Sequence, residues 1–365
     1  MKTIKVKLGA RSYPIIIGDN LLTRVGKFVK TIPNVGAALV ITNKKIKSLY
    51  GAKLAKSLRE AGIQSQFVIV ADSEKSKSTA TWIKTINKIC DFDKGRGIAV
   101  VALGGGVIGD LAGFVAACYH RGVPLVQIPT TLLAQVDSAI GGKTAVDLPL
   151  GKNLIGAFYQ PKMVISDIGL IESLPLKEIK NGIAEIIKYA VILDSSLFKY
   201  LEKALPRLMQ FNKDVLGHVI STCSRLKATV VAADEKETSG YRSILNFGHT
   251  IGHALETSAS YTKQMAHGQA VAVGMLCACD IARGMNALDG KDALKIENLI
   301  ARANLPRRAT VSSISGVLKA ISYDKKIISG KLRFILPLAI GHVVVCSNID
   351  KKLIKKAIRG RVKCT

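Results

Sequence analysis

Three of the six histidines fall within nineteen positions, and one carboxylate is placed to join them. His249 and His253 are four residues apart, which puts both side chains on one face of a helix, and His267 follows. Zinc binds imidazole nitrogens and carboxylates, and a catalytic zinc keeps one position open. Glu185 is the best acidic candidate, because an unpaired carboxylate is costly to bury in its apolar stretch. The residues predict a metal site, and spacing alone nominates His249 and His253 as paired ligands.

A structural interpretation of the same residues stays open. Glu185 can pair with Lys188 or Lys227, and the histidines can be hydrogen-bonded groups of the core. For a single histidine that interpretation would be the better one. The cluster of three histidines together with Glu185 favours the metal, because a metal site needs several such donors in one place.

A glycine-rich segment has the form of a dinucleotide-binding loop. Gly104, Gly106 and Gly109 satisfy G-x-G-x-x-G between a predicted strand and a predicted helix. Glycines there let backbone N–H groups approach a pyrophosphate at a helix N-terminus, where the helix dipole favours negative charge. The acidic residue usual about 20 residues further on is missing, and Thr130 stands there. We expect a dinucleotide site of unusual construction, with a tight turn as the alternative.

Several cationic residues lie on glycine-flanked segments that we predict to be loops. Lys143, Lys152 and Asn153 follow the carboxyl end of a predicted strand, the edge where open α/β sheets bind ligands. A lysine offers a point charge that suits a phosphate or a carboxylate. The alternative is turn chemistry with exposed lysines, and Arg121 carries the same ambiguity.

The order of predicted strands and helices before residue 167 is that of an α/β domain. Continuous apolar runs indicate strands buried on both faces, and apolar residues at helical spacing indicate helices, one with Ser78 as its N-cap. Strands are expected at 4–8, 14–17, 37–42, 67–70, 98–103 and 125–128, and helices at 44–61 and 78–90. The first two strands suggest a hairpin, and the later alternation predicts a mostly parallel, Rossmann-like sheet with helices on both faces.

After Asp167 the pattern becomes almost entirely helical. Helices are expected at 177–192, 195–208, 215–232, 244–258, 269–284 and 292–303, followed by a strand pair at 334–337 and 342–345 and a basic helix at 351–359. We therefore predict a dinucleotide-binding α/β domain over 1–167 and a mainly α-helical, metal-binding domain over 168–365.

The composition is that of a folded protein with a basic surface. The 365 residues include 53 Lys and Arg against 26 Asp and Glu, a formal net charge of +27. The basic residues are scattered, without aromatic interleaving or zinc-finger spacing, so we expect no nucleic-acid partner. No window reaches the roughly 20 apolar residues of a membrane span, so no membrane partner is expected. Seven cysteines without a CxxC pair suit reduced thiols in the cytoplasm.

Long segments resemble the 3-dehydroquinate synthase family of the sugar-phosphate cyclase superfamily. They cover 104–122, 128–161, 181–192, 227–237, 242–256 and 267–275, in the order of that family. The resemblance implies a cytoplasmic, homodimeric lyase of the shikimate pathway and aromatic amino acid biosynthesis. Its small anionic substrate would be 3-deoxy-D-arabino-heptulosonate 7-phosphate, and its cofactors NAD and Zn2+, with Co2+ as a substitute. By this resemblance NAD accepts the C5 hydride, phosphate is eliminated, the hydride returns, and an intramolecular aldol closure gives 3-dehydroquinate.

The resemblance also implies roles for individual residues. The metal ligands would be Glu185, His249 and His267, which overrules the pair nominated by spacing. The substrate phosphate would be held by Lys143, Asn153, Asn246, His253 and Lys325, with Lys326 as the alternative to Lys325. Lys227 and Arg242 would pair with the substrate carboxylate. The reacting hydroxyls would be surrounded by Asp137, Lys152, Lys188 and Glu237. Arg121 would reach the neighbouring subunit's site.

The implied NAD residues lie on the glycine loop and on segments around it. They are Asn43, Glu74, Lys77, Gly105, Gly106, Val107, Asp110, Thr130, Thr131, Leu133 and Glu178, with Asp137, Lys143 and Lys152 shared with the substrate. Two positions depart from the family pattern. Gln269 stands where the family usually has a Glu, which would weaken metal binding if that Glu orients a ligand histidine. Asn43 stands where an Asp often contacts the ribose.

Two related activities are the alternatives. A cyclase acting on a sugar phosphate without a carboxylate would have no use for the clamp of Lys227 and Arg242. A polyol dehydrogenase with net NAD turnover would have no use for the phosphate-binding Lys143, Lys152 and Asn153. The presence of these residues favours the synthase.

Overall fold

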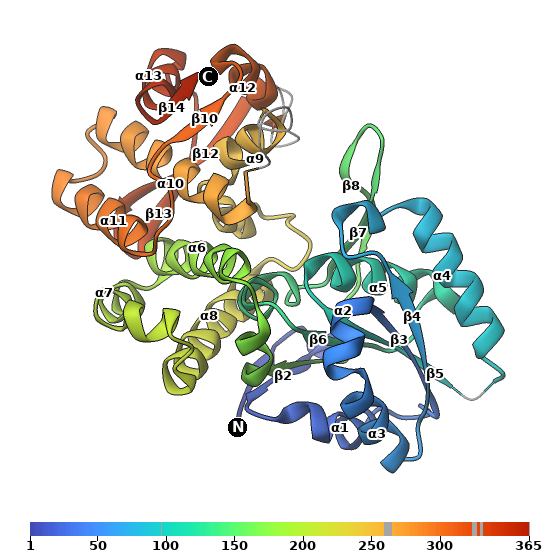
Figure 1. Cartoon of the computed structure of the whole chain (residues 1–365). Coiled ribbons are helices and arrows are strands. Elements are labelled where there is room, and N and C mark those ends of the chain that lie inside the picture. Colours follow the sequence, from blue (N-terminus) through green and yellow to red (C-terminus); the bar gives the residue numbers. More distant parts are fainter. Residues whose placement is uncertain (96, 259–264, 323–326, 329–330, 365) are drawn as a thin grey trace. The chain divides into compact units, whose positions relative to one another are not determined.

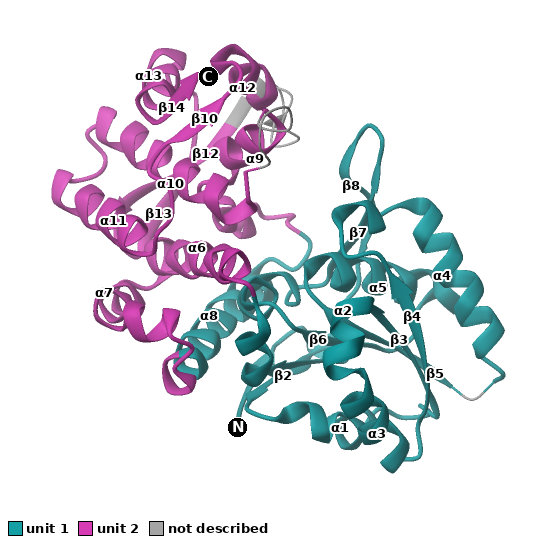
Figure 2. Ribbon diagram, viewed as in Figure 1, with its two compact units in different colours: residues 1–174, 216–236 teal, residues 175–215, 237–365 magenta. Residues whose placement is uncertain are grey.

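The computed structural model describes residues 1–95, 97–258, 265–322, 327–328 and 331–364, and it divides into two compact units (Figure 2). Unit 1 holds residues 1–174 and 216–236, and unit 2 holds residues 175–215 and 237–365. Our division at Asp167 stays a prediction about domains. The two units do not coincide with the two predicted domains, because most of α8 (Lys213–Ala233) belongs to unit 1. There Lys227 Nζ donates a hydrogen bond to the backbone oxygen of Asp137 at 2.7 Å.

Unit 1 is built on a mostly parallel sheet of seven strands (Figure 1). The strand order is β1-β2-β9-β6-β5-β3-β4, in which β1 and β2 are antiparallel and the other neighbours are parallel. The strands are β1 (Lys2–Val6), β2 (Tyr13–Gly18), β3 (Ala37–Asn43), β4 (Gln64–Val70), β5 (Ile98–Gly104), β6 (Leu125–Pro129) and β9 (Met163–Asp167). The predicted fold class is thereby confirmed for this part of the chain.

Helices cover both faces of this sheet. Along β3, Val40 belongs to a core cluster with residues of α1 (Val25–Val29) and α3 (Ala52–Glu60). The next residue, Ile41, belongs to a second cluster with residues of α4 (Thr79–Phe92) and α5 (Gly106–Cys118). Since successive side chains of a strand point to opposite faces, both faces are buried. This explains why the strands are continuous apolar runs.

Most predicted helices of unit 1 are present. Ser78 caps α4 by accepting a hydrogen bond from the N–H of Thr81, as predicted. The single helix expected over 44–61 is instead α2 (Lys44–Ile46), a π-helical turn at Lys47–Gly51 and α3. In a π turn the backbone hydrogen bond spans five residues, one more than in an α-helix, while the helix itself continues. The pattern of apolar residues therefore does not reveal the π turn.

The expectation that Lys143, Lys152 and Asn153 lie on loops is wrong. Lys143 begins β7 (Lys143–Leu148), and the other two residues lie on β8 (Gly151–Phe158). The two strands form an antiparallel hairpin, drawn as a green loop in Figure 1. Most residues of β8 are exposed, and an exposed strand does not need the apolar alternation by which strands are predicted.

Unit 2 is mainly helical, as predicted. Its helices are α6 (Leu176–Leu193), α7 (Ser195–Met209), α9 (His249–Ser258), α10 (His267–Gly284), α11 (Gly290–Arg302), α12 (Ile314–Ser322) and α13 (Lys351–Arg361). The predicted late strand pair is present as β12 (Lys331–Ala339) and β13 (His342–Ser347), next to β11 (Ile327–Ile328). A parallel pair, β10 (Ala309–Val311) and β14 (Val362–Cys364), was not predicted.

One predicted helix of unit 2 is two elements. The helix expected over 244–258 begins at His249, and the residues before it form the 3₁₀ helix η8 (Tyr241–Asn246). Gly248 lies between them with a φ of +77°, a backbone conformation that favours glycine. Within the described parts of the chain, no helix is long and apolar enough to cross a membrane.

Candidate active-site residues

Glu185, His249 and His267 converge in unit 2. Glu185 lies on α6, and the two histidines are the first residues of α9 and α10. Nε2 of His249 lies 3.5 Å and Nε2 of His267 lies 3.4 Å from the same oxygen, Oε1 of Glu185. One ligand atom from each residue lies within 4.8 Å of the others. Two imidazole nitrogens and one carboxylate oxygen are a donor set that suits zinc and leaves a coordination position open.

Close helix packing brings the two histidines to this place. A Cβ at Gly274 of α10 would lie 2.0 Å from the carbonyl oxygen of Gly248, so only glycine allows α10 to approach the start of α9 this closely. The start of α10 is held to α6 by the N–H of Gly268, which donates to Oδ1 of Asn181 at 2.9 Å. The ligand geometry therefore depends on backbone contacts between helices.

The second ring nitrogen of each histidine also has a neighbour. Nδ1 of His249 lies 3.1 Å from the backbone oxygen of Phe247, and Nδ1 of His267 lies 3.4 Å from a carboxylate oxygen of Glu256. Such contacts orient the ring and leave Nε2 for a metal. Burial lowers the pKa of His249 well below its usual value, so its ring is neutral. Burial also opposes the charge of His267, but Glu185 and Glu256 outweigh it and raise its pKa to about 10.

Glu256 is a residue that the sequence analysis missed. We expected Gln269 to replace a carboxylate that orients a ligand histidine. Instead, Oε1 of Gln269 accepts a hydrogen bond from the N–H of Ala266 at 3.1 Å and closes the first turn of α10. The carboxylate beside His267 comes from Glu256, one helical turn after His253. The i, i+3 spacing places Glu256 near His253, but no local pattern in the sequence links it to His267.

The pair nominated by spacing is not the pair that surrounds Glu185. His253 is exposed, and its ring centroid lies 5.4 Å from that of His249. It falls in a second group of possible ligands, with Glu256 and His267. The alternative partner Lys188 does contact Glu185, and both side chains are buried. The structure thus contains the predicted ion pair, and it also brings together the three residues whose role as metal ligands stays a prediction.

The other implied residues of unit 2 have defined positions. Arg242 is 2% exposed, and its Nε lies 3.8 Å from Glu237, which has a φ of +59°. Asn246 ends η8 and is partly buried. Glu178 lies in the first turn of α6, where Nδ2 of Asn181 donates to it at 3.2 Å. The predictions for Lys325 and Lys326 lie outside the described residues.

In unit 1 the glycine loop adopts the predicted arrangement. It follows β5, and α5 begins at Gly106 with Gly105 as its N-cap. A Cβ at Gly104 would lie 2.6 Å from Ile108, which explains the need for glycine there. Thr130 follows β6 and is buried, with its N–H donating to Gly104. Val107, Thr131 and Leu133 are partly buried beside the same strand ends.

Asn43 has a local structural role. It ends β3 and caps α2, with Oδ1 accepting from the N–H of Ile46 at 2.8 Å. Its Nδ2 donates to Asp72 at 2.8 Å. Both ends of the amide are therefore engaged within the protein, and contact with a ribose stays a prediction.

Charged residues implied in cofactor and substrate binding gather on the hairpin side of unit 1. Lys77 Nζ donates to Asp110 Oδ2 at 2.7 Å, and Lys152 Nζ lies 3.6 Å from Glu74. Lys77 also donates to Asn153.

Elsewhere in unit 1, the ammonium of Lys227 contacts the carboxylate of Asp137. Lys143 and Arg121 are exposed, and Arg121 has a φ of +61°.

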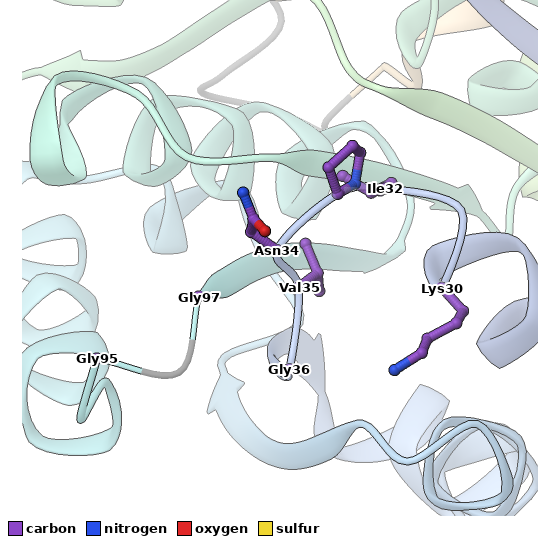
Figure 3. A pocket seen from close by; sticks show the side chains of 8 residues that line it. Lys30, Ile32, Asn34, Val35, Gly36, Gly95 and Gly97 are labelled. Carbon is purple, nitrogen blue, oxygen red and sulfur yellow. The ribbon is translucent and has the colours of Figure 1, made fainter.

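A shallow hollow in unit 1 lies away from these residues (Figure 3). Its lining includes Lys30, Asn34 and Gly97 and borders the amino ends of β3 and β5. Parallel α/β sheets bind ligands at the carboxyl ends of their strands. We therefore place no function in this hollow.

Solved structures with this fold define the class of protein. The chain has a TM-score of 0.89 and 26% identity to 2-deoxy-scyllo-inosose synthase complexed with carbaglucose-6-phosphate, NAD+ and Co2+, covering 99% of this chain and 100% of that one. It has a TM-score of 0.86 and 24% identity to the NAD+- and Zn2+-bound 2-epi-5-epi-valiolone synthase of Streptomyces hygroscopicus subsp. jinggangensis 5008. This match covers 99% of this chain and 98% of that one, and it shows a similarity of fold. The chain has the fold of the sugar-phosphate cyclases.

Sequence comparison narrows this class to one family. Residues 67–181 match the model of the 3-dehydroquinate synthase N-terminal region, and residues 182–327 match that of the C-terminal region. The 3-dehydroquinate synthase of Desulforamulus reducens (strain ATCC BAA-1160 / DSM 100696 / MI-1) is 43% identical over 352 residues, which are 96% of this chain and 98% of that protein. The chain belongs to the 3-dehydroquinate synthase family. The resemblance inferred from the sequence and the prediction of an enzyme are confirmed.

Proposed function

We propose that this chain converts 3-deoxy-D-arabino-heptulosonate 7-phosphate to 3-dehydroquinate and phosphate, with NAD and a divalent metal ion as cofactors. The observation that carries the proposal is the convergence of Glu185, His249 and His267 in a chain of this family. Their donor chemistry fits zinc, and Co2+ suits the same ligands. When bound, the metal polarises a substrate hydroxyl, and NAD takes and returns the hydride of its carbon.

The chain's own residues bind the substrate's two anionic groups. Arg242 is buried, and its planar guanidinium suits the substrate carboxylate, with Lys227 as the second cation. For the phosphate, the donors are Lys143, Asn153, Asn246, His253 and Lys325. These donors offset the charge that develops on the phosphate as it leaves.

Other residues orient the reacting hydroxyls and NAD. Lys188 is buried beside Glu185, where its ammonium can donate to a hydroxyl oxygen next to the metal. Asp137, Lys152 and Glu237 surround the remaining hydroxyls. NAD is held by the glycine loop, with its pyrophosphate at the start of α5, as the dipole of that helix favours. The proposed nucleotide residues are Asn43, Glu74, Lys77, Gly105, Gly106, Val107, Asp110, Thr130, Thr131, Leu133 and Glu178.

We also propose a homodimer in the cytoplasm. The β7–β8 hairpin exposes apolar side chains, with Leu150 at 92% and Leu154 and Phe158 at about two fifths. Exposed apolar surface of this kind marks association sites. Arg121, exposed after α5, would serve the partner's site. Cysteines of both units, such as Cys118 and Cys279, are thiols and not disulfides, which suits a reducing compartment.

The test is to incubate the purified protein with the heptulosonate phosphate, Zn2+ and NAD, and to identify the carbocyclic product. A glucose phosphate that lacks a carboxylate serves as the comparison substrate. The proposal expects product only from the heptulosonate phosphate, because the Lys227 and Arg242 clamp needs a carboxylate. Turnover of the glucose phosphate alone would identify a different cyclase, and stoichiometric accumulation of NADH would identify a dehydrogenase.

A further inference from the structure

A buried lysine joins two parts of unit 1 that the proposed function uses. Lys77 follows the 3₁₀ helix η4 (Glu74–Ser76), and its side chain is 5% exposed. Its ammonium donates to Oδ2 of Asp110 at 2.7 Å and to Oδ1 of Asn153 at 2.5 Å. Asp110 lies near the start of α5, which the glycine loop opens, and Asn153 lies on β8 of the hairpin. One cation thus contacts the nucleotide-loop helix and the hairpin.

Three hydrogen bonds close a ring through this lysine. The N–H of Asp147 donates to the backbone oxygen of Lys77 at 2.7 Å, and the N–H of Asn153 donates to Oδ1 of Asp147 at 2.7 Å. The Lys77 ammonium then returns to the Asn153 amide. Asn153 is exposed and has a φ of +54°. Packing therefore does not fix its side chain, and the ring of hydrogen bonds does.

The chemistry of this ring decides which way the amide faces. An ammonium has three donors and no acceptor, so Lys77 can meet only the oxygen of the Asn153 amide. The two N–H donors on Nδ2 are then directed away from Lys77. Burial opposes the charge on Lys77, but Asp110, with Glu74 and Asp147, outweighs it and raises the pKa of the lysine. The ammonium therefore holds this orientation at neutral pH.

We propose that Lys77 is a positioning residue that presents the N–H donors of Asn153 to the substrate phosphate and couples that amide to Asp110 at the nucleotide loop. The inference rests on the proposed function, in which Asn153 binds phosphate. It implies that NAD strengthens phosphate binding through Lys77. Thermodynamic linkage requires phosphate to strengthen NAD binding by the same factor.

The test measures binding of inorganic phosphate to the full-length protein by titration calorimetry, with and without NAD. Lys77→Met should weaken phosphate binding about tenfold, the value of one hydrogen bond to a charged group. It should also abolish the strengthening by NAD, measured at NAD concentrations that saturate the variant. Asn153→Ala should cause a similar loss. The double variant should lose no more than either single variant, because both changes remove one coupled interaction. The matched control is Lys75→Met, which changes an exposed lysine on η4, the 3₁₀ helix that Lys77 follows, and it should bind phosphate like the parent.

Two results would overturn the inference: parental phosphate affinity in Lys77→Met, or additive losses in the double variant. Lys77→Met leaves the Asp110 carboxylate without its ammonium partner. Phosphate binding is therefore also measured for the variant that combines Lys77→Met with Asp110→Asn, in the absence of NAD. Circular dichroism first verifies that this variant is folded. Failure of the proposed function has a different signature. The parent itself would then release no phosphate from the heptulosonate phosphate, whereas an active parent with an unaffected Lys77→Met variant contradicts only the role of Lys77.

Discussion

Replacing Glu256 by Gln tests whether this carboxylate orients His267 toward the metal. The change keeps the shape of the side chain and removes its charge. The two oxygens of Glu256 lie 3.4 and 3.5 Å from Nδ1 of His267, and both side chains are only partly buried, at 25% and 32% exposed. Carboxylates beside ligand histidines contribute 10- to 100-fold to metal affinity. The partial exposure places the expected loss near the lower value, about tenfold, or ~1.4 kcal/mol.

The assay is competition for Zn2+ with a chromophoric chelator at several pH values. Zinc needs a neutral His267, so zinc competes with a proton below the ligand's pKa of about 10. Glu256 helps to raise that pKa, so Glu256→Gln also relieves some proton competition. The affinity gap between parent and variant should therefore widen as the pH rises from 7 to 9.

The matched control is Gln269→Glu, which adds a carboxylate at the position where the family usually has one. Because Gln269 bonds to the N–H of Ala266, this change should alter zinc affinity little. Equal zinc affinity in Glu256→Gln and the parent at every pH would refute the orienting role of Glu256. A tenfold gain in zinc affinity in Gln269→Glu would show that a carboxylate at position 269, and not Glu256, orients the ligand histidine.

Three further changes probe other parts of the account. Lys143→Ala should raise the KM for the heptulosonate phosphate about tenfold through the loss of one charged contact, and steady-state kinetics unchanged from the parent would remove it from the site. Gly274→Ala should lower zinc content in elemental analysis, because a Cβ 2.0 Å from the Gly248 oxygen must separate α10 from α9; full zinc content would show that the helices can adjust. Arg361→Met should destabilise the protein by about 2 kcal/mol in urea unfolding at pH 7, between the values for exposed and buried ion pairs. The hydrogen bond from Arg361 lowers the pKa of Glu297, so this stabilisation is present above the unfolded pKa and is lost as the pH falls through the folded pKa. A stability gap between parent and variant that does not narrow as the pH is lowered would contradict this.

Sequence patterns predicted the fold where burial dictates residue type. The parallel strands are covered on both faces, so β3 and β5 are continuous apolar runs that can be recognised directly. The β7–β8 hairpin was missed because β8 is exposed and no apolar periodicity is required of it. The start of α9 was misplaced because the break depends on the conformation of Gly248, which local spacing does not reveal.

The candidate site was less accessible to local reasoning. Spacing within one helix proposed His249 and His253, but the pair beside Glu185 comes from the first residues of two helices. Their approach depends on the contact of Gly274 with Gly248, a tertiary feature without a periodic signature. The set that converges in the structure was the one implied by the family resemblance. Neither approach identified Glu256, because its partner ring lies eleven residues away on another helix.

The most direct measurement follows phosphate release from the heptulosonate phosphate in the presence of Zn2+ and far less NAD than substrate. If NAD is reduced and reoxidised within each catalytic cycle, many phosphates should be released per NAD. Absorbance at 340 nm, which reports NADH, should then not rise. Phosphate release that stops at one equivalent of NAD, or NADH that rises in step with substrate loss, would contradict the account.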